Sequence, residues 1–150
     1  ERRCAREGQL AGMADSEKVL NVAVVSAERA LWTGQAKALV AKTPEGDIGI
    51  LPGHEPVLAL LVESAPLRIE EPDGSKVLVA IHGGFFSVAG NEVNVIAEVA
   101  ELAEDIDLPR AQAALARATE GGVTPEEESA VHRAETRIQV AGVAKGITAR

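Results

Sequence analysis

Residues 65–81 read APLRIEEPDGSKVLVAI, and this stretch decides the fold class of the chain. Two apolar segments, 65–71 and 76–81, flank the sequence Pro-Asp-Gly-Ser at 72–75. Proline, aspartate and glycine favour chain reversal, because each stabilises backbone angles that a tight turn needs. The pattern therefore predicts two strands joined by a turn.

The same pattern of short apolar segments and turn residues continues on both sides. Residues 85–89 and 92–97 flank Gly90 and Asn91, which predicts a second hairpin. Roughly eight to ten short strands at this spacing favour an all-β sandwich or barrel over a parallel α/β sheet. The remaining expected strands are 20–26, 35–42 and 57–62. The strand at 35–42 is expected to alternate between two faces, with Ala36, Ala38 and Val40 on one and Lys37, Leu39 and Ala41 on the other.

The pattern changes after residue 103, where alanines and charged residues recur at helical spacing. Asp107 is placed to cap a first helix, which the Gly-Gly pair at 121–122 should end. Thr124 and Glu127 form a capping box for a second helix, with Pro125 at its first position. The tail is therefore a helical hairpin. Its faces are rich in alanine, so at about 25 cal/mol per Å² it should dock weakly on the sandwich.

These patterns divide the chain into four parts. We expect a disordered extension or expression remnant at 1–16, a β-sandwich at 17–103, a two-helix hairpin at 104–143 and a flexible tail at 144–150. The arginines near residue 1 precede no apolar run, so they do not indicate a signal peptide. No segment approaches the roughly 18–20 apolar residues of a membrane span. Any membrane association is expected to go through another protein.

Composition narrows the function. The 150 residues are 46% apolar but only 2% aromatic, so the core must consist of Val, Leu, Ile and Ala. The net charge of −8 makes nucleic acid a poor partner, because duplex DNA is itself densely negative. Cys4 is the only cysteine, which excludes an intrachain disulfide and favours the cytosol.

Residues 47–54 read DIGILPGH and predict a rigid loop that closes on His54 and Glu55. Glycine tolerates backbone angles that other residues resist, and proline fixes φ and removes a donor. A loop stiffened in this way holds one shape. It is better suited to docking a partner than to simple chain reversal.

Catalytic and metal sites are not indicated. His54 and Glu55 begin like a zinc-protease helix, but Pro56 forbids the helix and no second histidine follows at the required spacing. A small hydrolase centred on His54 and His82 is one rival interpretation, although it lacks an evident nucleophile. The glycine-rich segments carry no phosphate-loop sequence. The four serines considered as nucleophiles occupy strands or turns without a nucleophile elbow: Ser26, Ser64, Ser75 and Ser87.

Arginines on the two helices form the one polar group of interest. Arg110 and Arg117 lie on the first helix, while Arg133 and Arg137 share a face of the second. Folding could bring several guanidinium groups near a helix start, which would suit a phosphate. The alternative is a solvated charged surface with pairs to glutamates, and spacing alone favours that alternative.

The β part and the hairpin together resemble the epsilon subunit of the F-type ATP synthase. The matching stretches occur in one order from residue 20 to the end of the second helix. They are VVSAER at 24–29, Gly34, GILPGH at 49–54, RI at 68–69, DG at 73–74, GGF at 83–85 and EDID at 104–107.

The resemblance implies a ten-stranded β-sandwich followed by a helical hairpin, in a non-catalytic rotor subunit of the central stalk. It implies binding to the gamma subunit, to the c-subunit ring and, when the hairpin extends, to the alpha/beta catalytic hexamer. Such a subunit couples proton flow to ATP synthesis, regulates ATP hydrolysis through its helices, and lies peripherally at the cytoplasmic face of the plasma membrane. No cofactor or metal is implied, apart from ATP as a regulatory ligand.

The resemblance also assigns residues. The partner-binding positions are Asp47, Gly49, Leu51, Pro52, Gly53 and His54. Bacterial members that bind ATP use an Ile/Leu-Asp-x-x-Arg-Ala motif, and the implied ATP-binding positions are Glu101, Ile106, Asp107, Arg110, Ala111, Arg117, Arg133 and Arg137. A stand-alone ATP-sensing module that uses the same site is the alternative function. Pro109 inside the motif departs from the family pattern, and Gly142 is expected to weaken the end of the second helix by about 1 kcal/mol.

Overall fold

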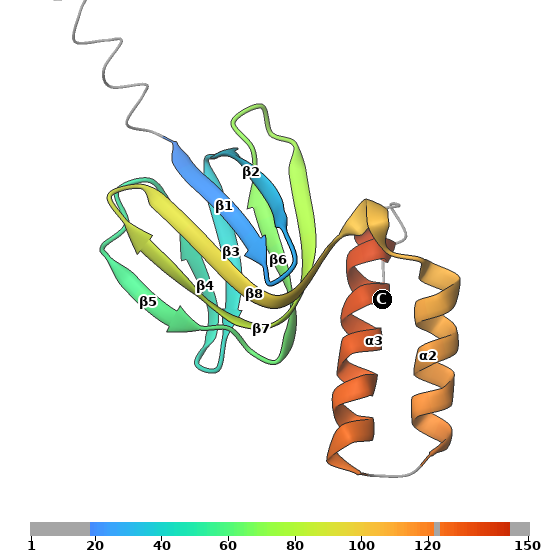
Figure 1. Cartoon of the computed structure of the whole chain (residues 1–150). Coiled ribbons are helices and arrows are strands. Elements are labelled where there is room, and N and C mark those ends of the chain that lie inside the picture. Colours follow the sequence, from blue (N-terminus) through green and yellow to red (C-terminus); the bar gives the residue numbers. More distant parts are fainter. Residues whose placement is uncertain (1–18, 122–123, 145–150) are drawn as a thin grey trace, which may run out of the picture.

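The computed structural model describes residues 19–121 and 124–144. The expected extension at 1–16 lies outside these residues, as does the expected tail except for Ala144, which ends the last helix. The described chain forms a β-sandwich followed by two helices (Figure 1). Its elements are β1 Leu20–Ser26, β2 Ala30–Ala36, β3 Ala38–Thr43, β4 Gly46–Ile50, β5 Val57–Leu60, β6 Ser64–Glu70, β7 Lys76–Ala89, β8 Glu92–Leu102, the 3-10 turn η1 Ala103–Asp105, α2 Leu108–Glu120 and α3 Pro125–Ala144.

The eight strands form one hydrogen-bonded sheet that folds over into two layers. The two long strands β7 and β8 take part in both layers, because each changes partners along its length. In one layer the order is β2-β1-β8-β7-β5, and in the other it is β8-β7-β6-β3-β4. Each layer therefore contains five strand segments. This confirms the sandwich and explains how eight strands fill the places of about ten.

The bend of β7 lies at Gly83 and Gly84. Their φ angles are 70° and 128°, which side chains disfavour. A Cβ atom at Gly84 would lie 2.2 Å from the carbonyl oxygen of Ile96 in β8. The prediction of two separate strands at 76–81 and 85–89 was therefore wrong. The glycines bend one continuous strand from layer to layer.

The core lies between the layers and is built from aliphatic residues, as the composition predicted. Phe86 is the one aromatic side chain that is fully buried there. The largest fully buried aliphatic side chains include Leu20, Leu39, Ile50, Leu67, Ile69, Val79, Val88, Val93 and Val95.

The expected strand at 35–42 is two strands that belong to different layers. The break falls at Lys37, whose backbone N–H donates to the carbonyl of Glu70 at 2.8 Å, while its ammonium lies 3.1 Å from the Glu70 carboxylate. Ala36 before the break and Leu39 after it both point inward. Ala36 and Leu39 are three residues apart, whereas the inward-facing residues of a single strand are separated by two. One continuous strand therefore cannot place both side chains in the core.

The turn predictions agree with the structure. The turn at 72–75 joins β6 to β7, with Gly74 at φ 91° and Ser75 N–H donating to Asp73 Oδ1 at 2.8 Å. Gly90 and Asn91 join β7 to β8 with φ angles of 57° and 66°. Two positive φ angles in succession are typical of the tightest hairpin turns.

Both helices of the hairpin begin where the sequence placed their caps. Asp107 caps α2 by accepting the Arg110 N–H at 3.1 Å, and Pro109 sits in the first turn, where its missing donor costs little. Thr124 and Glu127 exchange capping hydrogen bonds at the start of α3. Gly142 does not end α3: it is buried within the helix, which continues to Ala144.

The hairpin lies beside the sandwich, with α3 between the sheet and α2 (Figure 1). The apolar cluster that joins them is small. It consists of Leu78, Ala80, Ile106, Val140 and Ala141. Side chains of this size bury little area, so their packing contributes only modestly to docking.

Candidate functional site

The partner-binding positions implied by the resemblance fall on two neighbouring pieces of chain. Asp47 and Gly49 lie in the edge strand β4, so only the second half of the expected rigid loop is a loop. The other four, Leu51 to His54, form a turn closed by the His54 N–H donating to the Leu51 carbonyl at 3.0 Å. Proline at its second position and Gly53 at φ 85° are typical of a type II turn.

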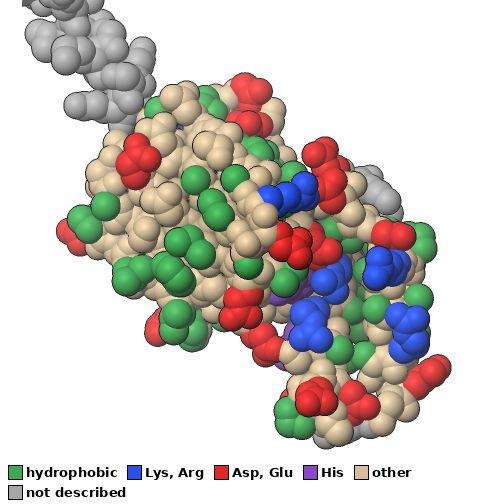
Figure 2. Space-filling model, viewed as in Figure 1, with side chains coloured by type: hydrophobic (Ala, Val, Ile, Leu, Met, Phe, Trp, Pro, Cys, Tyr) green, Lys and Arg blue, Asp and Glu red, His purple; other side chains and the backbone are tan. Residues whose placement is uncertain are grey.

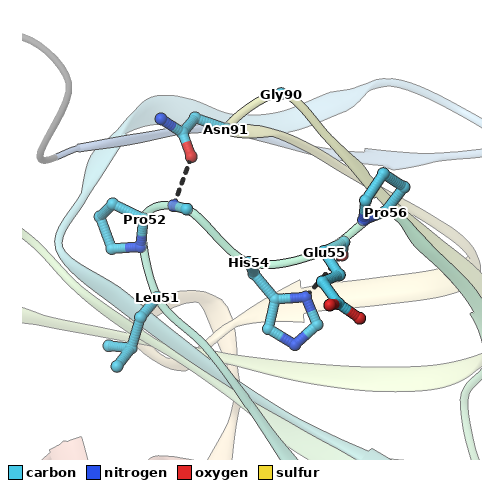
Figure 3. Close-up of a pocket in the computed structure, with 8 residues that line it drawn as sticks. Leu51, Pro52, His54, Glu55, Pro56, Gly90 and Asn91 are labelled. Atoms are coloured by element: carbon cyan, nitrogen blue, oxygen red, sulfur yellow. Dashed lines mark hydrogen bonds between the residues drawn. The ribbon is translucent and has the colours of Figure 1, made fainter.

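Asn91 pins this turn to the β7–β8 hairpin (Figure 3). Its side-chain Oδ1 accepts the Gly53 N–H at 2.7 Å, and its carbonyl accepts the Asn21 N–H at 2.8 Å. The turn borders an open hollow of about 920 Å³, which is also lined by Glu55 and Pro56. His54 Nδ1 lies 2.7 Å from the Glu55 carbonyl. The turn is therefore closed by its own backbone hydrogen bond and fixed to the β7–β8 hairpin by Asn91.

An apolar row crosses the outer face of the layer next to this loop. Leu60, Phe85 and Ile96 are register partners on β5, β7 and β8, and so share one face. Leu60 is 67% exposed and Leu58, two residues earlier, is 71% exposed. Figure 2 shows hydrophobic side chains gathered on this part of the sandwich, and basic ones on the hairpin. Large exposed apolar side chains in one row mark a contact surface.

A second hollow lies where β8, the start of α2 and the middle of α3 meet. Its volume is about 310 Å³. Seven of the eight implied ATP-binding residues line it, and Arg133 does not. The lining residues are Glu101, Asp105, Ile106, Asp107, Arg110, Ala111, Ala114, Arg117 and Arg137.

The acids of this hollow are already engaged. Asp107 caps α2, and Asp105 pairs with Arg29 at 3.6 Å. Within 19–121 and 124–144, no ion pair engages Arg110 or Arg117, and Arg137 uses only its Nε. Arg110 lies in the first turn of α2 and Arg117 in its last turn, and such unpaired guanidinium groups suit an anionic ligand.

Glu101 connects the hollow to the hairpin and to the sheet. Its Oε2 accepts from Arg137 Nε at 2.5 Å and lies 3.2 Å from His82 Nε2. The bond from His82 lowers the pKa of the Glu101 carboxyl to about 2, and the Arg137 bond and charge add to this against the opposing effect of burial. The carboxylate is therefore ionised at any physiological pH.

Arg133 belongs to a different contact. It donates from Nη1 to Ser129 Oγ at 2.8 Å, and Ser129 in turn donates to the Glu63 carboxylate on the sandwich. This chain of bonds fastens α3 to the β5–β6 connection. The structure therefore does not bring Arg133 together with the other implied ligands.

Ser64, His82 and Glu101 form a row that the sequence did not reveal. Ser64 Oγ lies 2.6 Å from His82 Nδ1, so the three side chains have the order of a hydrolase triad. However, Glu101 is shared with Arg137, His82 is 5% exposed, and neither Ser64 nor His82 lines the hollow. The arrangement does not support the hydrolase interpretation. The one signal in the sequence is the position of His82, directly after the apolar run 77–81. A polar residue that is buried there needs a hydrogen-bond partner.

In 19–121 and 124–144, no group of three or more His, Cys, Asp or Glu side chains has the placement of a metal site. Neither described helix has the length and apolarity needed to cross a bilayer.

Known proteins are similar to this chain in sequence. The family described as "ATP synthase, Delta/Epsilon chain, beta-sandwich domain" matches residues 19–103. The ATP synthase epsilon chain of Streptomyces coelicolor is 46% identical over 123 residues, which cover 81% of this chain and 94% of the relative. That of Rhodococcus jostii is 50% identical over 97 residues, covering 65% and 80%.

Two solved structures have a similar fold. A chain in the mitochondrial ATP synthase of Euglena gracilis (OSCP/F1/c-ring) matches with a TM-score of 0.64 and 24% identity, over 86% of this chain and 81% of that one. A chain in the central stalk/c-ring of the Tetrahymena thermophila enzyme matches with a TM-score of 0.51 and 16% identity, over 86% and 96%. At these identities the likeness concerns the fold. From the family match and the sequence relatives, the chain belongs to the ATP synthase epsilon chain family.

Proposed function

We propose that this chain is a rotor subunit in the central stalk of a proton-translocating F-type ATP synthase. In this role it performs no chemistry, helps to couple proton flow to ATP synthesis, and regulates ATP hydrolysis through its two helices. It is held peripherally at the cytoplasmic face of the plasma membrane through its partners. Family membership supports the proposal, and so does the division into a rigid sandwich and a lightly packed hairpin.

The observation that carries the proposal is the exposed apolar row beside the pinned turn. The row crosses β5, β7 and β8, and β5 begins three residues after the turn ends at His54. The proposed occupant is the gamma subunit, since leucine and phenylalanine side chains this exposed need a partner. The edge strand β4, with Asp47 and Gly49, is the proposed contact with the c ring. The hairpin is proposed to reach the alpha/beta hexamer when it extends.

Size-exclusion chromatography of this chain with purified gamma tests the assignment. We expect the wild type to co-elute, and Leu60→Glu to weaken the complex at least about tenfold, because it places a charge in the apolar row. Val143→Glu is the matched control, since Val143 is 47% exposed on α3, away from the row. If the wild type does not co-elute, or if both variants bind equally well, the proposed surface is wrong.

ATP is the proposed regulatory ligand of the second hollow. Arg110 in the first turn of α2 and Arg117 in its last turn, neither of them in an ion pair, support this proposal, as does the convergence of residues from β8, α2 and α3. A nucleotide bound there would contact sandwich and hairpin at once. It would therefore favour the docked hairpin, to the extent that it binds the docked state more tightly than the undocked state.

Calorimetry with ATP checks the ligand. We expect measurable binding by the wild type and at least about tenfold weaker binding by Arg110→Ala, which removes a charge-assisted phosphate contact. Arg68→Ala is the control, because Arg68 is exposed on β6 and does not line the hollow. Absence of heat at millimolar ATP would remove the ligand proposal. Binding of ATP without binding of gamma would instead support the stand-alone ATP-sensing module.

A further inference from the structure

A polar row lies under α3, on the face of the sandwich that the hairpin covers. Ser64 in β6 and His82 in β7 are register partners, and Glu101 follows in the neighbouring strand β8. Leu78 and Ala80, on the same face of β7, pack against Val140 and Ala141 of α3. His82 therefore lies on the same face of β7 as Leu78 and Ala80. It is the one buried polar side chain of that strand.

Both ring nitrogens of His82 are engaged. A carboxylate can only accept, so Nε2 donates to Glu101 at 3.2 Å. In the neutral ring Nδ1 then accepts the Ser64 hydroxyl at 2.6 Å. A buried imidazole with both nitrogens bonded has one orientation, and it holds the Glu101 oxygen in one place.

The oxygen that His82 holds is the one that α3 uses. Arg137 Nε lies 2.5 Å from the same Oε2 of Glu101. Among the described residues, this is the one ion pair between α3 and the sandwich. The Ser129–Glu63 hydrogen bond is a second polar contact, but it lies in the first half of the helix. Because the apolar cluster is small, the Glu101 contact carries a large share of the docking.

We propose that His82 is a positioning residue that fixes the Glu101 carboxylate for Arg137, and so sets how firmly the helical hairpin is held on the sandwich. Ser64 anchors the imidazole from the far side. Docking by this route needs no nucleotide. The inference deepens the proposed hairpin regulation, but it rests on contacts within this chain rather than on ATP binding.

The other charged groups near Glu101 do not replace this function. Those that face it from the packed elements are His82 of β7, Arg137 of α3, Asp105 and Asp107 at the start of α2, and Arg110 and Arg117 of α2. The two aspartates are engaged elsewhere and share the sign of Glu101. Arg110 and Arg117 form no ion pair with Glu101. Without His82, only Arg137 would hold the carboxylate.

Replacing His82 with glutamine or with asparagine distinguishes its hydrogen bond to Glu101 from its contribution to packing. The amide nitrogen of glutamine can take the place of Nε2 and still donate to Glu101, whereas asparagine is too short to reach it. Hydrogen exchange of the full chain at neutral pH is expected to show about tenfold faster exchange of α3 in His82→Asn, as for loss of a hydrogen bond to a charged group. We expect His82→Gln to stay within about threefold of the wild type.

An NMR titration of the Glu101 carboxyl gives a readout that packing alone would not move. The Glu101 pKa should rise above about 2 in His82→Asn and stay close to the wild-type value in His82→Gln, because the His82 bond is the main cause of its lowering. If the asparagine variant does not fold, Ser64→Ala should loosen α3 in the same direction. Equal effects of both amides, or loss of protection in the sandwich core together with α3, would overturn the proposal. Absence of ATP binding would leave these outcomes unaffected.

Discussion

Replacing Gly84 with alanine is expected to destabilise the sandwich by about 3 kcal/mol or more. Two costs add at this position. The φ angle of 128° is one that side chains disfavour, and the new Cβ atom would lie 2.2 Å from the Ile96 carbonyl oxygen and 2.8 Å from the Ala97 Cα. Both obstacles are backbone atoms of the paired strand, so relief requires β7 and β8 to separate where they cross between layers.

Urea unfolding followed by the fluorescence of Trp32, the single tryptophan, measures this loss. Gly74→Ala is the matched control, because Gly74 also has a positive φ, 91°, but open space around its Cα. That variant should lose only about 1 kcal/mol, the cost of the backbone angle alone. Equal losses in the two variants would show that the bend at Gly84 tolerates a side chain, contrary to the layered account of β7.

Replacing Glu101 with glutamine is expected to release the helical hairpin at neutral pH. The change removes the charge that Arg137 and His82 share, and it leaves Arg137 half-buried without its ion pair. Loss of about 2 kcal/mol of docking corresponds to a roughly 30-fold increase in the open population. Faster hydrogen exchange of α3, with the sandwich unchanged, measures it. Glu63→Gln is the control, since its amide oxygen can still accept from Ser129.

Acid should produce the same release in the wild type. The pKa of Glu101 is lowered from 4.5 to about 2 in the folded chain. Its contribution to docking is therefore present above pH 4.5 and is lost as the pH falls towards about 2. In Glu101→Gln this pH dependence should disappear. If α3 in the variant stays as protected as in the wild type at neutral pH, the Glu101 contact is not what holds the hairpin.

The parts of the fold that the sequence predicted well depend on local chemistry. The turns at 72–75 and 90–91, and the caps of α2 and α3, are set by residues within a few positions of one another. The break at Lys37 and the bend at Gly84 depend on distant strands. Lys37 bonds to Glu70, and the space at Gly84 is limited by Ile96. Alternation alone cannot show where a strand changes layers.

The candidate site likewise has a part that the sequence could predict and a part that depends on distant strands. The resemblance placed seven residues around one hollow, since the family motif runs through a single turn of chain and its neighbours. Arg133 lies outside this hollow, because it and Arg137, four residues apart on α3, meet different parts of the sandwich. The contacts that join Ser64, His82 and Glu101 went unrecognised, because they form only through the pairing of β6, β7 and β8. No short spacing in the sequence encodes that contact.

Hydrogen exchange of the full chain, alone and bound to gamma, tests most directly whether a rigid sandwich carries a separately mobile hairpin. We expect the amides of α2 and α3 to exchange well before those of β7 and β8 in the free chain. Gamma should further protect β5 and the turn at Leu51, next to the apolar row. Helices that exchange only together with the sandwich core, or a sandwich whose exchange gamma leaves unchanged, would contradict this picture.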